Sequence, residues 1–189
     1  MKLQLALDDI STADALGLVD RVKAFVDIVE IGTPFILEEG MAPVRAFKAR
    51  YPDLEILADT KIMDAGEYEA QLAFNAGADY VTVLGVTDMA TIAGCLKAAR
   101  KCGKSVVVDM ICVVDIAARI AQLEQIGVIA LAVHTGVDQQ AAGRTPLASS
   151  GFVTTTSHAP CSAPVSANEA EIDDPPPSTI TGSATMSGC

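Results

Sequence analysis

Short apolar runs alternate with longer segments of helical periodicity over most of the chain. The runs are rich in Val, Ile, Leu and Ala and contain few polar positions, a pattern typical of strands buried on both faces of a parallel sheet. We therefore predict six strands, which lie at 3–7, 26–31, 56–58, 80–84, 105–111 and 129–133.

Each predicted strand is followed by a segment whose apolar residues recur at helical spacing. Ser11 is the expected N-cap of the first helix and Asp64 that of the third, while Gly77 and Gly103 are expected to end helices. The predicted helices lie at 11–25, 39–51, 64–75, 88–101 and 114–126. A β–α unit of about 25 residues suits either a (β/α)8 barrel or a doubly wound sheet.

Nucleotide-binding versions of these folds carry glycine-rich phosphate loops. No Gly-x-Gly-x-x-Gly follows the first predicted strand, and no Gly-x-x-x-x-Gly-Lys-Ser/Thr occurs in the sequence. The dinucleotide and mononucleotide interpretations therefore lack the motifs that would hold their phosphates.

The character of the sequence changes after Leu147. Ser, Thr, Ala and Pro dominate from there on, with a proline run at 175–177, no Lys or Arg after Arg144 and no further Leu. This composition cannot bury enough apolar surface to offset the entropy lost on ordering, so we expect residues 149–189 to be disordered. Residues 1–148 form the predicted barrel-type domain. A shifted reading frame would explain the abrupt change, and the coding DNA at the junction would test that hypothesis.

Charge and composition exclude several classes of protein. A net charge of −11 argues against binding to nucleic acid or to anionic membranes. No apolar run reaches the length of a membrane span, and the first residues do not resemble a signal peptide, so we expect a cytoplasmic protein. The five cysteines contain no Cys-x-x-Cys pair. We expect Cys95, Cys102 and Cys112 to be small core residues in a reducing compartment.

Polar side chains stand at or near the ends of most predicted strands. They are Asp8, Glu30, Asp59 with Lys61, Asp109 and His134. Each has an ordinary structural explanation, such as a turn acid, a salt bridge or a satisfied core histidine. In a barrel, however, the carboxyl ends of all strands meet at one mouth, where barrel enzymes place their chemistry.

The residue types in this set predict a particular chemistry. Several carboxylates facing one pocket repel each other, and a divalent cation such as Mg²⁺ commonly relieves that repulsion through oxygen ligands. Such an ion can stabilise an enediolate as it forms. His134 has the side chain best suited to proton transfer near neutral pH.

Six sequence motifs at these strand ends resemble one enzyme family. They are Leu5-Ala-Leu-Asp8, Val29-Glu-Ile-Gly-Thr-Pro34, Leu57-Ala-Asp-Thr-Lys-Ile-Met-Asp64, Tyr80-Val-Thr-Val-Leu-Gly85, Val108-Asp-Met-Ile111 and Val133-His-Thr-Gly136. Together they resemble 3-hexulose-6-phosphate synthases, which belong to the orotidine-5′-phosphate decarboxylase superfamily of (β/α)8 barrels. The resemblance covers roughly residues 1–148, in which six of the eight β/α units are recognisable.

This resemblance implies Mg²⁺-dependent aldol addition of formaldehyde to D-ribulose 5-phosphate, the formaldehyde-fixing step of the ribulose monophosphate pathway. It implies that Glu30 and Asp59 bind the metal and that Asp8 and Lys61 contact substrate and metal. His134 would act as acid and base, and the other expected catalytic residues are Lys61, Asp64, Asp8 and Asp109.

The resemblance also implies a homodimer, because in relatives the residue that matches Asp64 reaches the active site of the partner subunit. The related 3-keto-L-gulonate-6-phosphate decarboxylases have Glu at the position of Asp109 and Arg at that of Val137, and both differences favour the synthase.

The family's glycine loops after strands seven and eight are not recognisable beyond Leu147, so no residue can be assigned to the substrate phosphate. Three alternatives remain: a synthase, the related decarboxylase, and an inactive incomplete barrel that keeps only the acidic site and the dimer surface.

Overall fold

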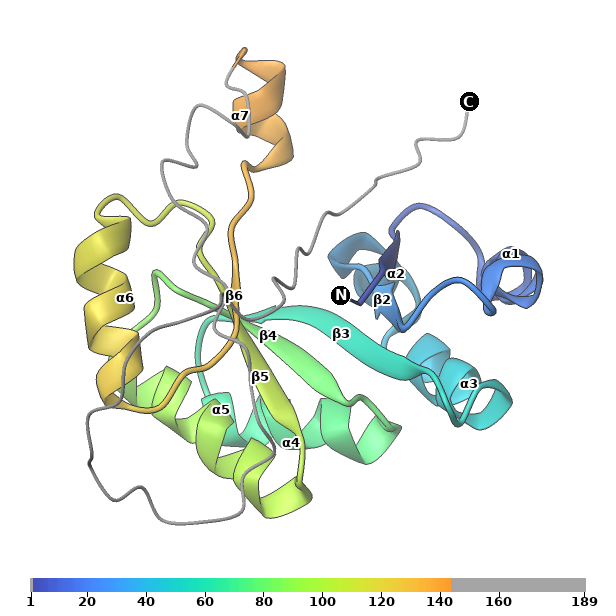
Figure 1. The fold of residues 1–189 in the computed structure, drawn as a ribbon, viewed down its shortest axis with the longest axis horizontal. Helices are drawn as coiled ribbons and strands as arrows, with labels where there is room; N and C mark the ends of the chain where they lie inside the picture. Colours follow the sequence, from blue (N-terminus) through green and yellow to red (C-terminus); the bar gives the residue numbers. More distant parts are fainter. Residues whose placement is uncertain (1, 144–189) are drawn as a thin grey trace, which may run out of the picture.

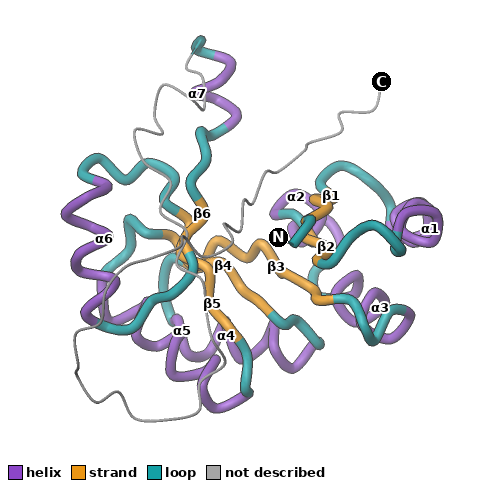
Figure 2. Tube along the Cα trace, viewed as in Figure 1, coloured by secondary structure: helices purple, strands orange, loops and turns teal. Residues whose placement is uncertain are grey.

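Six parallel strands form one curved sheet in the computed structural model, which describes residues 2–143 (Figures 1 and 2). The strands are β1 (Gln4–Leu7), β2 (Ile28–Ile31), β3 (Glu55–Ile62), β4 (Tyr80–Leu84), β5 (Ser105–Asp109) and β6 (Leu131–Ala132). Each strand pairs in parallel with the next one in the chain, so the order is β1-β2-β3-β4-β5-β6.

The helices connect consecutive strands. They are α1 (Thr12–Val22), α2 (Thr33–Glu39), α3 (Ala42–Arg50), α4 (Gly66–Ala76), α5 (Met89–Cys102), α6 (Ile116–Gln125) and α7 (Val137–Ala141). Figure 1 shows α1, α3, α4, α5 and α6 along the outer side of the curved sheet. A doubly wound sheet reverses its strand order and carries helices on both faces. The sequential order and one-sided helices identify a (β/α) barrel-type half-barrel, which confirms the predicted fold class.

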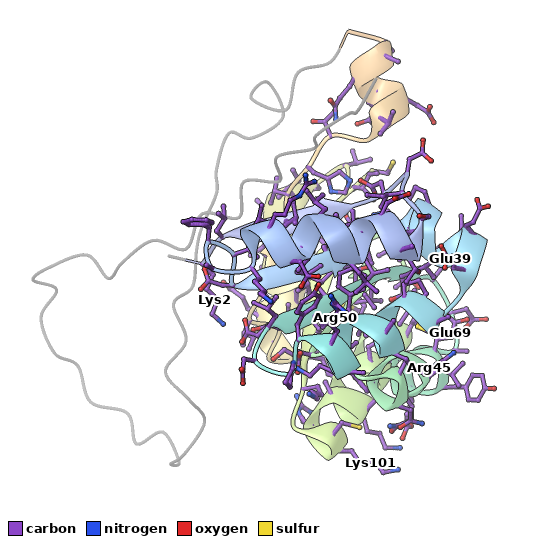
Figure 3. The ribbon with its side chains drawn as sticks, turned by 90° about the vertical axis from the view of Figure 1, so that its right-hand side faces the viewer. Lys2, Glu39, Arg45, Arg50, Glu69 and Lys101 are labelled. Carbon is purple, nitrogen blue, oxygen red and sulfur yellow. The ribbon has the colours of Figure 1, made fainter. Side chains whose placement is uncertain are left out.

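The core lies between the outer face of the sheet and the helices. Its largest fully buried side chains are aliphatic or phenylalanine, as the composition predicts: Phe35, Phe47, Ile31, Ile56, Ile62, Ile92, Leu123, Val19, Val29, Val44, Val81 and Val83. The outward faces of the helices carry charged side chains, together with a few exposed apolar ones such as Tyr68 and Leu72 of α4. Arg45 of α3, Glu69 of α4 and Lys101 of α5 project outward in Figure 3, whereas Arg50 of α3 forms an ion pair with Asp20 of α1.

Several predicted helix signals are present in the structure. The side chain of Ser11 accepts a hydrogen bond from the Asp14 amide at the start of α1. Gly77 and Gly103 adopt the left-handed conformation and end α4 and α5. These caps satisfy backbone groups that have no partner within the helix.

The predicted cap of α4 is wrong. The helix begins at Gly66 rather than at Asp64, and Ala65 is its N-cap residue without a capping side chain. Ala65 is left-handed, with φ +51°, so the chain turns once more before the helix starts. The Asp64 carboxylate instead accepts a hydrogen bond from the neighbouring Ala65 amide, at 2.7 Å.

Three other expectations need correction. The predicted helix at 39–51 is the shorter α3, and a separate helix that was not predicted, α2, precedes it with Pro34 in its first turn. The helix α7 was not predicted. Cys95 is buried as expected, but Cys112 is exposed, because it lies beyond the end of β5. The predicted disorder of 149–189 lies outside the described residues. Within residues 2–143, no helix is long and apolar enough to cross a membrane.

Candidate active site

The carboxyl ends of the strands bring the predicted polar residues together at one edge of the sheet. Asp8 directly follows β1, and Glu30 lies in β2 between its register partners Ala6 of β1 and Leu57 of β3. Further along the sheet are Asp59 and Lys61 in β3, Asp109 as the last residue of β5, and His134 just after β6.

Asp59 is the most heavily hydrogen-bonded of these residues. Thr82 donates to Oδ1 and Thr33 donates to Oδ2, each at 2.7 Å. The ammonium group of Lys61 contacts both oxygens, at 3.1 Å and 2.8 Å. These contacts keep the Asp59 side chain, which is only 10% exposed, in a single orientation.

Lys61 joins two strand ends through its ammonium group. Its Nζ lies 2.8 Å from Asp59 Oδ2 in β3 and 3.0 Å from Asp109 Oδ2 in β5. Burial works to lower the pKa of Lys61, but the attraction of Asp59 and Asp109 outweighs it and raises the pKa. Lys61 is therefore a fixed positive charge between two carboxylates.

Asp109 and His134 form the other end of this network. The second oxygen of Asp109 lies 3.2 Å from His134 Nδ1, and it also accepts the Ile111 amide at 2.9 Å. Burial works to raise the pKa of Asp109, but His134, the Ile111 amide and Lys61 together lower it. The bond to Asp109 raises the pKa of His134. Asp109 thus orients the imidazole and favours its protonated form.

Glu30 and Asp8 make up the acidic end of the site. Burial, followed by repulsion from Asp59, raises the pKa of Glu30 to about 7, although Gln4 donates to its Oε2 at 2.5 Å. Burial and the Asp59 charge also raise the pKa of Asp8. The absence of a side chain at Gly32 makes this arrangement possible, because a Cβ there would lie 2.0 Å from Asp8 Oδ1.

This donor set fits a hard divalent cation. Glu30, Asp59 and Asp8 offer only oxygen ligands, and burial together with repulsion from Asp59 raises the pKa values of Glu30 and Asp8. In residues 2–143 no three His, Cys, Asp or Glu side chains are yet gathered closely enough to chelate an ion. The Asp59 oxygens are filled by protein donors, so a cation that binds Asp59 must displace at least one of them.

Asp64 lies apart from this network. It is exposed in the loop between β3 and α4, where it borders a cavity of about 440 Å³ together with Glu67, Tyr68 and Asp88. A second cavity of about 330 Å³ is lined by His134, Met110 and Cys112, among others. His134 therefore borders a cavity, whereas Asp59, Lys61 and Asp109 line neither of these two.

Sequence reasoning missed three residues that hold the carboxylates: Gln4, Thr33 and Thr82. A signal for Thr82 was present, because it is a polar residue in the apolar run of β4 and is only 4% exposed. Thr33 lies between the predicted strand at 26–31 and the predicted helix at 39–51, whereas in the structure it is the first residue of α2.

The fold and the site together define a class of protein. A parallel barrel-type sheet with carboxylates, an ammonium group and an imidazole at its carboxyl end is typical of a barrel enzyme that handles a small polar substrate. The chain belongs to the orotidine 5′-phosphate decarboxylase / HUMPS family, whose model matches residues 1–170. That match extends beyond residues 1–148, in which the motifs are recognisable.

Relatives with named activities show which enzymes of this family the chain resembles. The chain is 49% identical over 144 residues to 3-hexulose-6-phosphate synthase of Bacillus subtilis, covering 76% of this chain and 69% of the relative. It is 50% identical over 141 residues to the enzyme of the same name from Mycobacterium gastri, covering 75% and 68%. Relatives at this level of identity show that the chain is an enzyme of the lyase class.

Solved structures agree with these relatives. A 3-hexulose-6-phosphate synthase from Salmonella typhimurium superposes with a TM-score of 0.76 at 58% identity, covering 78% of this chain and 70% of that one. A 3-keto-L-gulonate-6-phosphate decarboxylase from Vibrio cholerae superposes with a TM-score of 0.69 at 30% identity, covering 75% and 66%.

Proposed function

We propose that the chain is a Mg²⁺-dependent aldolase that adds formaldehyde to D-ribulose 5-phosphate. The network from Asp59 through Lys61 and Asp109 to His134 carries the proposal, because it places a base, a fixed cation and carboxylates at one edge of the sheet. Relatives named 3-hexulose-6-phosphate synthase support the choice of substrates.

His134 is the proposed acid and base. Its Nδ1 faces Asp109, which leaves Nε2 as the nitrogen that can exchange a proton with the substrate. Asp109 raises the pKa of His134 and so makes the imidazole a stronger base. In its neutral form the imidazole removes the proton from the carbon next to the substrate ketone, and the resulting enediolate carbon forms a bond to the carbon of formaldehyde. The formaldehyde oxygen becomes an alkoxide, and the imidazolium returns the proton to it.

Lys61 and the acidic group have electrostatic roles in this proposal. The Lys61 ammonium is a fixed positive charge that can stabilise negative charge on a substrate oxygen. Glu30 and Asp59 would hold Mg²⁺, with Asp8 as a polar partner of metal and substrate. When bound, the ion would offset the negative charge that develops on the substrate oxygens.

Two observations favour the synthase over the related decarboxylase. Identity to the Salmonella synthase is 58%, against 30% to the Vibrio decarboxylase. At the two positions where the decarboxylases are expected to have Glu and Arg, this chain has Asp109 and Val137. The Val137 side chain is exposed at the start of α7 and offers no charge to a substrate.

We further propose that this chain is a weak catalyst. Barrel enzymes commonly hold a substrate phosphate in the loops after strands seven and eight. No glycine pair occurs after Leu147 in the sequence, so the phosphate lacks a recognisable backbone cradle. Charge-assisted hydrogen bonds contribute about 1.5–3 kcal/mol each, and losing several of them weakens substrate binding strongly.

A homodimer that uses the surface around Asp64 is part of the same proposal. The exposed apolar side chains of Met63, Tyr68 and Leu72 lie on the loop and helix that follow β3. A second copy that covers them would bring its own Asp64 close to this molecule. Sedimentation of wild type and of Tyr68→Lys tests this surface. A wild-type dimer that becomes a monomer in Tyr68→Lys supports the proposal, and a wild type that is itself a monomer excludes it.

A pair of assays on the same purified protein separates the candidate functions. One follows formaldehyde consumption with D-ribulose 5-phosphate and Mg²⁺, and the other follows CO2 release from 3-keto-L-gulonate 6-phosphate. We expect the first reaction to exceed the second. Faster CO2 release would replace the synthase with the decarboxylase, and the absence of both reactions from a folded protein would favour an inactive barrel.

A further inference from the structure

We propose that Thr82 is a positioning residue for this site, because its hydroxyl group links the Lys61 backbone to the Asp59 carboxylate. The link thereby fixes where the Lys61 ammonium lies. The catalytic meaning of the proposal rests on the proposed function, whereas the link itself is a property of the folded chain.

The backbone of Lys61 has an unusual conformation. Its φ is +45°, in the left-handed region that residues other than glycine rarely adopt and that costs about 1–3 kcal/mol. The β3–β4 pairing also shifts register between Ala58 and Ile62, so Lys61 lies within an irregular stretch of the ladder. An interaction that holds this conformation is therefore required.

Thr82 supplies that interaction. The Lys61 amide donates to Thr82 Oγ1 at 2.9 Å, and the same hydroxyl donates to Asp59 Oδ1 at 2.7 Å. A hydroxyl group has one donor and two acceptor sites, so both bonds can exist together. Thr60 Oγ1 donates in addition to the Thr82 carbonyl at 2.9 Å, which gives β3 and β4 a second side-chain contact at the same place.

The direction of the Lys61 side chain follows from this backbone geometry. A lysine stem is flexible, and in solution its ammonium group samples many positions. Here the ammonium lies 2.8 Å from Asp59 and 3.0 Å from Asp109, two strands away in the sheet. If the Lys61 amide lost its hydrogen bond to Thr82, the residue could return to an extended conformation. The Lys61 side chain would then start from a different backbone position and direction.

Thr33 offers a matched comparison. Its hydroxyl oxygen lies 2.7 Å from both Asp59 Oδ2 and the Asp59 carbonyl oxygen and donates its single proton to this pair, but no hydrogen bond connects it to the Lys61 backbone. Thr33→Val therefore removes a bond to Asp59 without releasing Lys61. Thr82→Val removes both bonds of the link, and Thr82→Ser retains them.

Amide hydrogen exchange, followed by NMR at Lys61, tests the link without any need for turnover. In Thr82→Val we expect exchange at Lys61 to accelerate about tenfold or more, equivalent to about 1.4 kcal/mol of lost protection. Thr82→Ser and Thr33→Val should stay within about twofold of wild type. The proposal would be overturned if Lys61 exchange were unchanged in Thr82→Val. It would also be overturned if exchange rose equally across all of β3 and β4, or if Thr33→Val accelerated Lys61 exchange as much as Thr82→Val.

Two further measurements complete the test. If Thr82→Val does not fold, wild type alone decides: a protected Lys61 amide supports the link, and exchange at the rate of a free amide refutes it. Where wild type turns over, Thr82→Val should lower kcat about tenfold with KM changed less than about twofold, and Thr82→Ser should restore kcat. A wild type without turnover contradicts the proposed function, while the exchange data still decide the link.

Discussion

At the scale of single residues, the site consists of opposite charges in close contact. The positive charge of Lys61 offsets Asp59 and Asp109, whereas Glu30 and Asp8 remain without a basic partner as close. A carboxylate buried beside other carboxylates favours protonation, which explains why the pKa of Glu30 rises to about 7. A bound cation would reverse that preference.

Replacing Asp59 with Asn tests the metal assignment. The amide keeps the shape of the side chain but removes its negative charge and one oxygen ligand, so we expect Mg²⁺ affinity to be lost. Calorimetric titration of the purified protein measures it, and Asp53→Asn, an exposed acid before β3, controls for net charge. Unchanged Mg²⁺ affinity in Asp59→Asn would exclude the residue as a ligand.

Replacing His134 with Gln tests the acid–base role. We expect turnover to fall by about 10²–10⁴-fold, the range for loss of general acid–base catalysis, with little change in folding. The chain has two histidines, so His158→Gln provides the control. Full activity in His134→Gln would reduce His134 to a structural residue.

At the scale of elements, the two helices after β3 and β4 pack very closely. A Cβ on Gly66 of α4 would lie 2.0 Å from the Thr91 carbonyl oxygen of α5, and Cys95 Sγ contacts the Gly66 carbonyl at 3.4 Å. These helices follow the strands that carry Asp59 and Thr82. Their separation therefore influences the geometry of the site.

Two glycine substitutions test this packing. Gly66→Ala should lower the free energy of unfolding by about 1–3 kcal/mol, the usual cost of overpacking, because backbone atoms must move. Gly17→Ala in α1, where nothing lies within 4 Å of the new methyl group, should raise it by about 0.5–1 kcal/mol. Urea unfolding measures both, and a neutral Gly66→Ala would contradict the close crossing.

Asp79 lies just before β4, at the amino ends of the strands, and its carboxylate connects neighbouring segments of the chain. It accepts Lys104 Nζ at 2.5 Å, Lys48 Nζ at 2.9 Å and the Ile56 amide at 2.9 Å. Partial burial works to raise the pKa of Asp79, but these donors outweigh it and lower the pKa. The ionised carboxylate therefore stabilises the folded state.

The lowered pKa of Asp79 predicts how stability changes with pH. Its contribution is complete above the unfolded value near 3.9 and is lost as pH falls through the lower folded value. The difference in unfolding free energy between wild type and Asp79→Asn should be constant from about pH 7 to 5 and shrink below about pH 4. Urea titrations across this range measure it; a difference independent of pH would refute the assignment.

The sequence indicated the strands far better than the details between them. Buried apolar runs located all six strands, because burial on both faces leaves little choice of residue. The left-handed backbone at Lys61 and Ala65 could not be predicted, since it depends on pairing with β4 and on the packing of α4 against α5. Pro34 was a usable signal for the start of α2, because proline favours the first turn of a helix.

The candidate site was predictable for a related reason. Parallel strands place their carboxyl ends at one edge, so Asp8, Glu30, Asp59, Asp109 and His134 could be grouped from chain order alone. Which of them would touch was not predictable. The contacts of Asp109 with both Lys61 and His134 depend on the curvature of the sheet, which no local pattern encodes.

At the scale of the whole molecule, the described sheet has two edges, β1 and β6. A closed barrel has no edges, and exposed edge strands invite pairing with other chains. Asp8 and His134 each lie next to one of these edges, so the site occupies the full width of the curved sheet. The ion pairs that connect Asp59, Lys61, Asp109 and His134 all lie within residues 2–143.

The most direct test of this account is product formation from ¹³C-formaldehyde and D-ribulose 5-phosphate, followed by NMR. The enzyme is used at a concentration close to that of the substrates, so that slow turnover remains visible. We expect a labelled hexulose phosphate to form slowly with Mg²⁺, to be absent with chelator, and to be absent in Asp59→Asn. Labelled product at the same rate without Mg²⁺, or none above the Asp59→Asn background, would contradict the proposed active site.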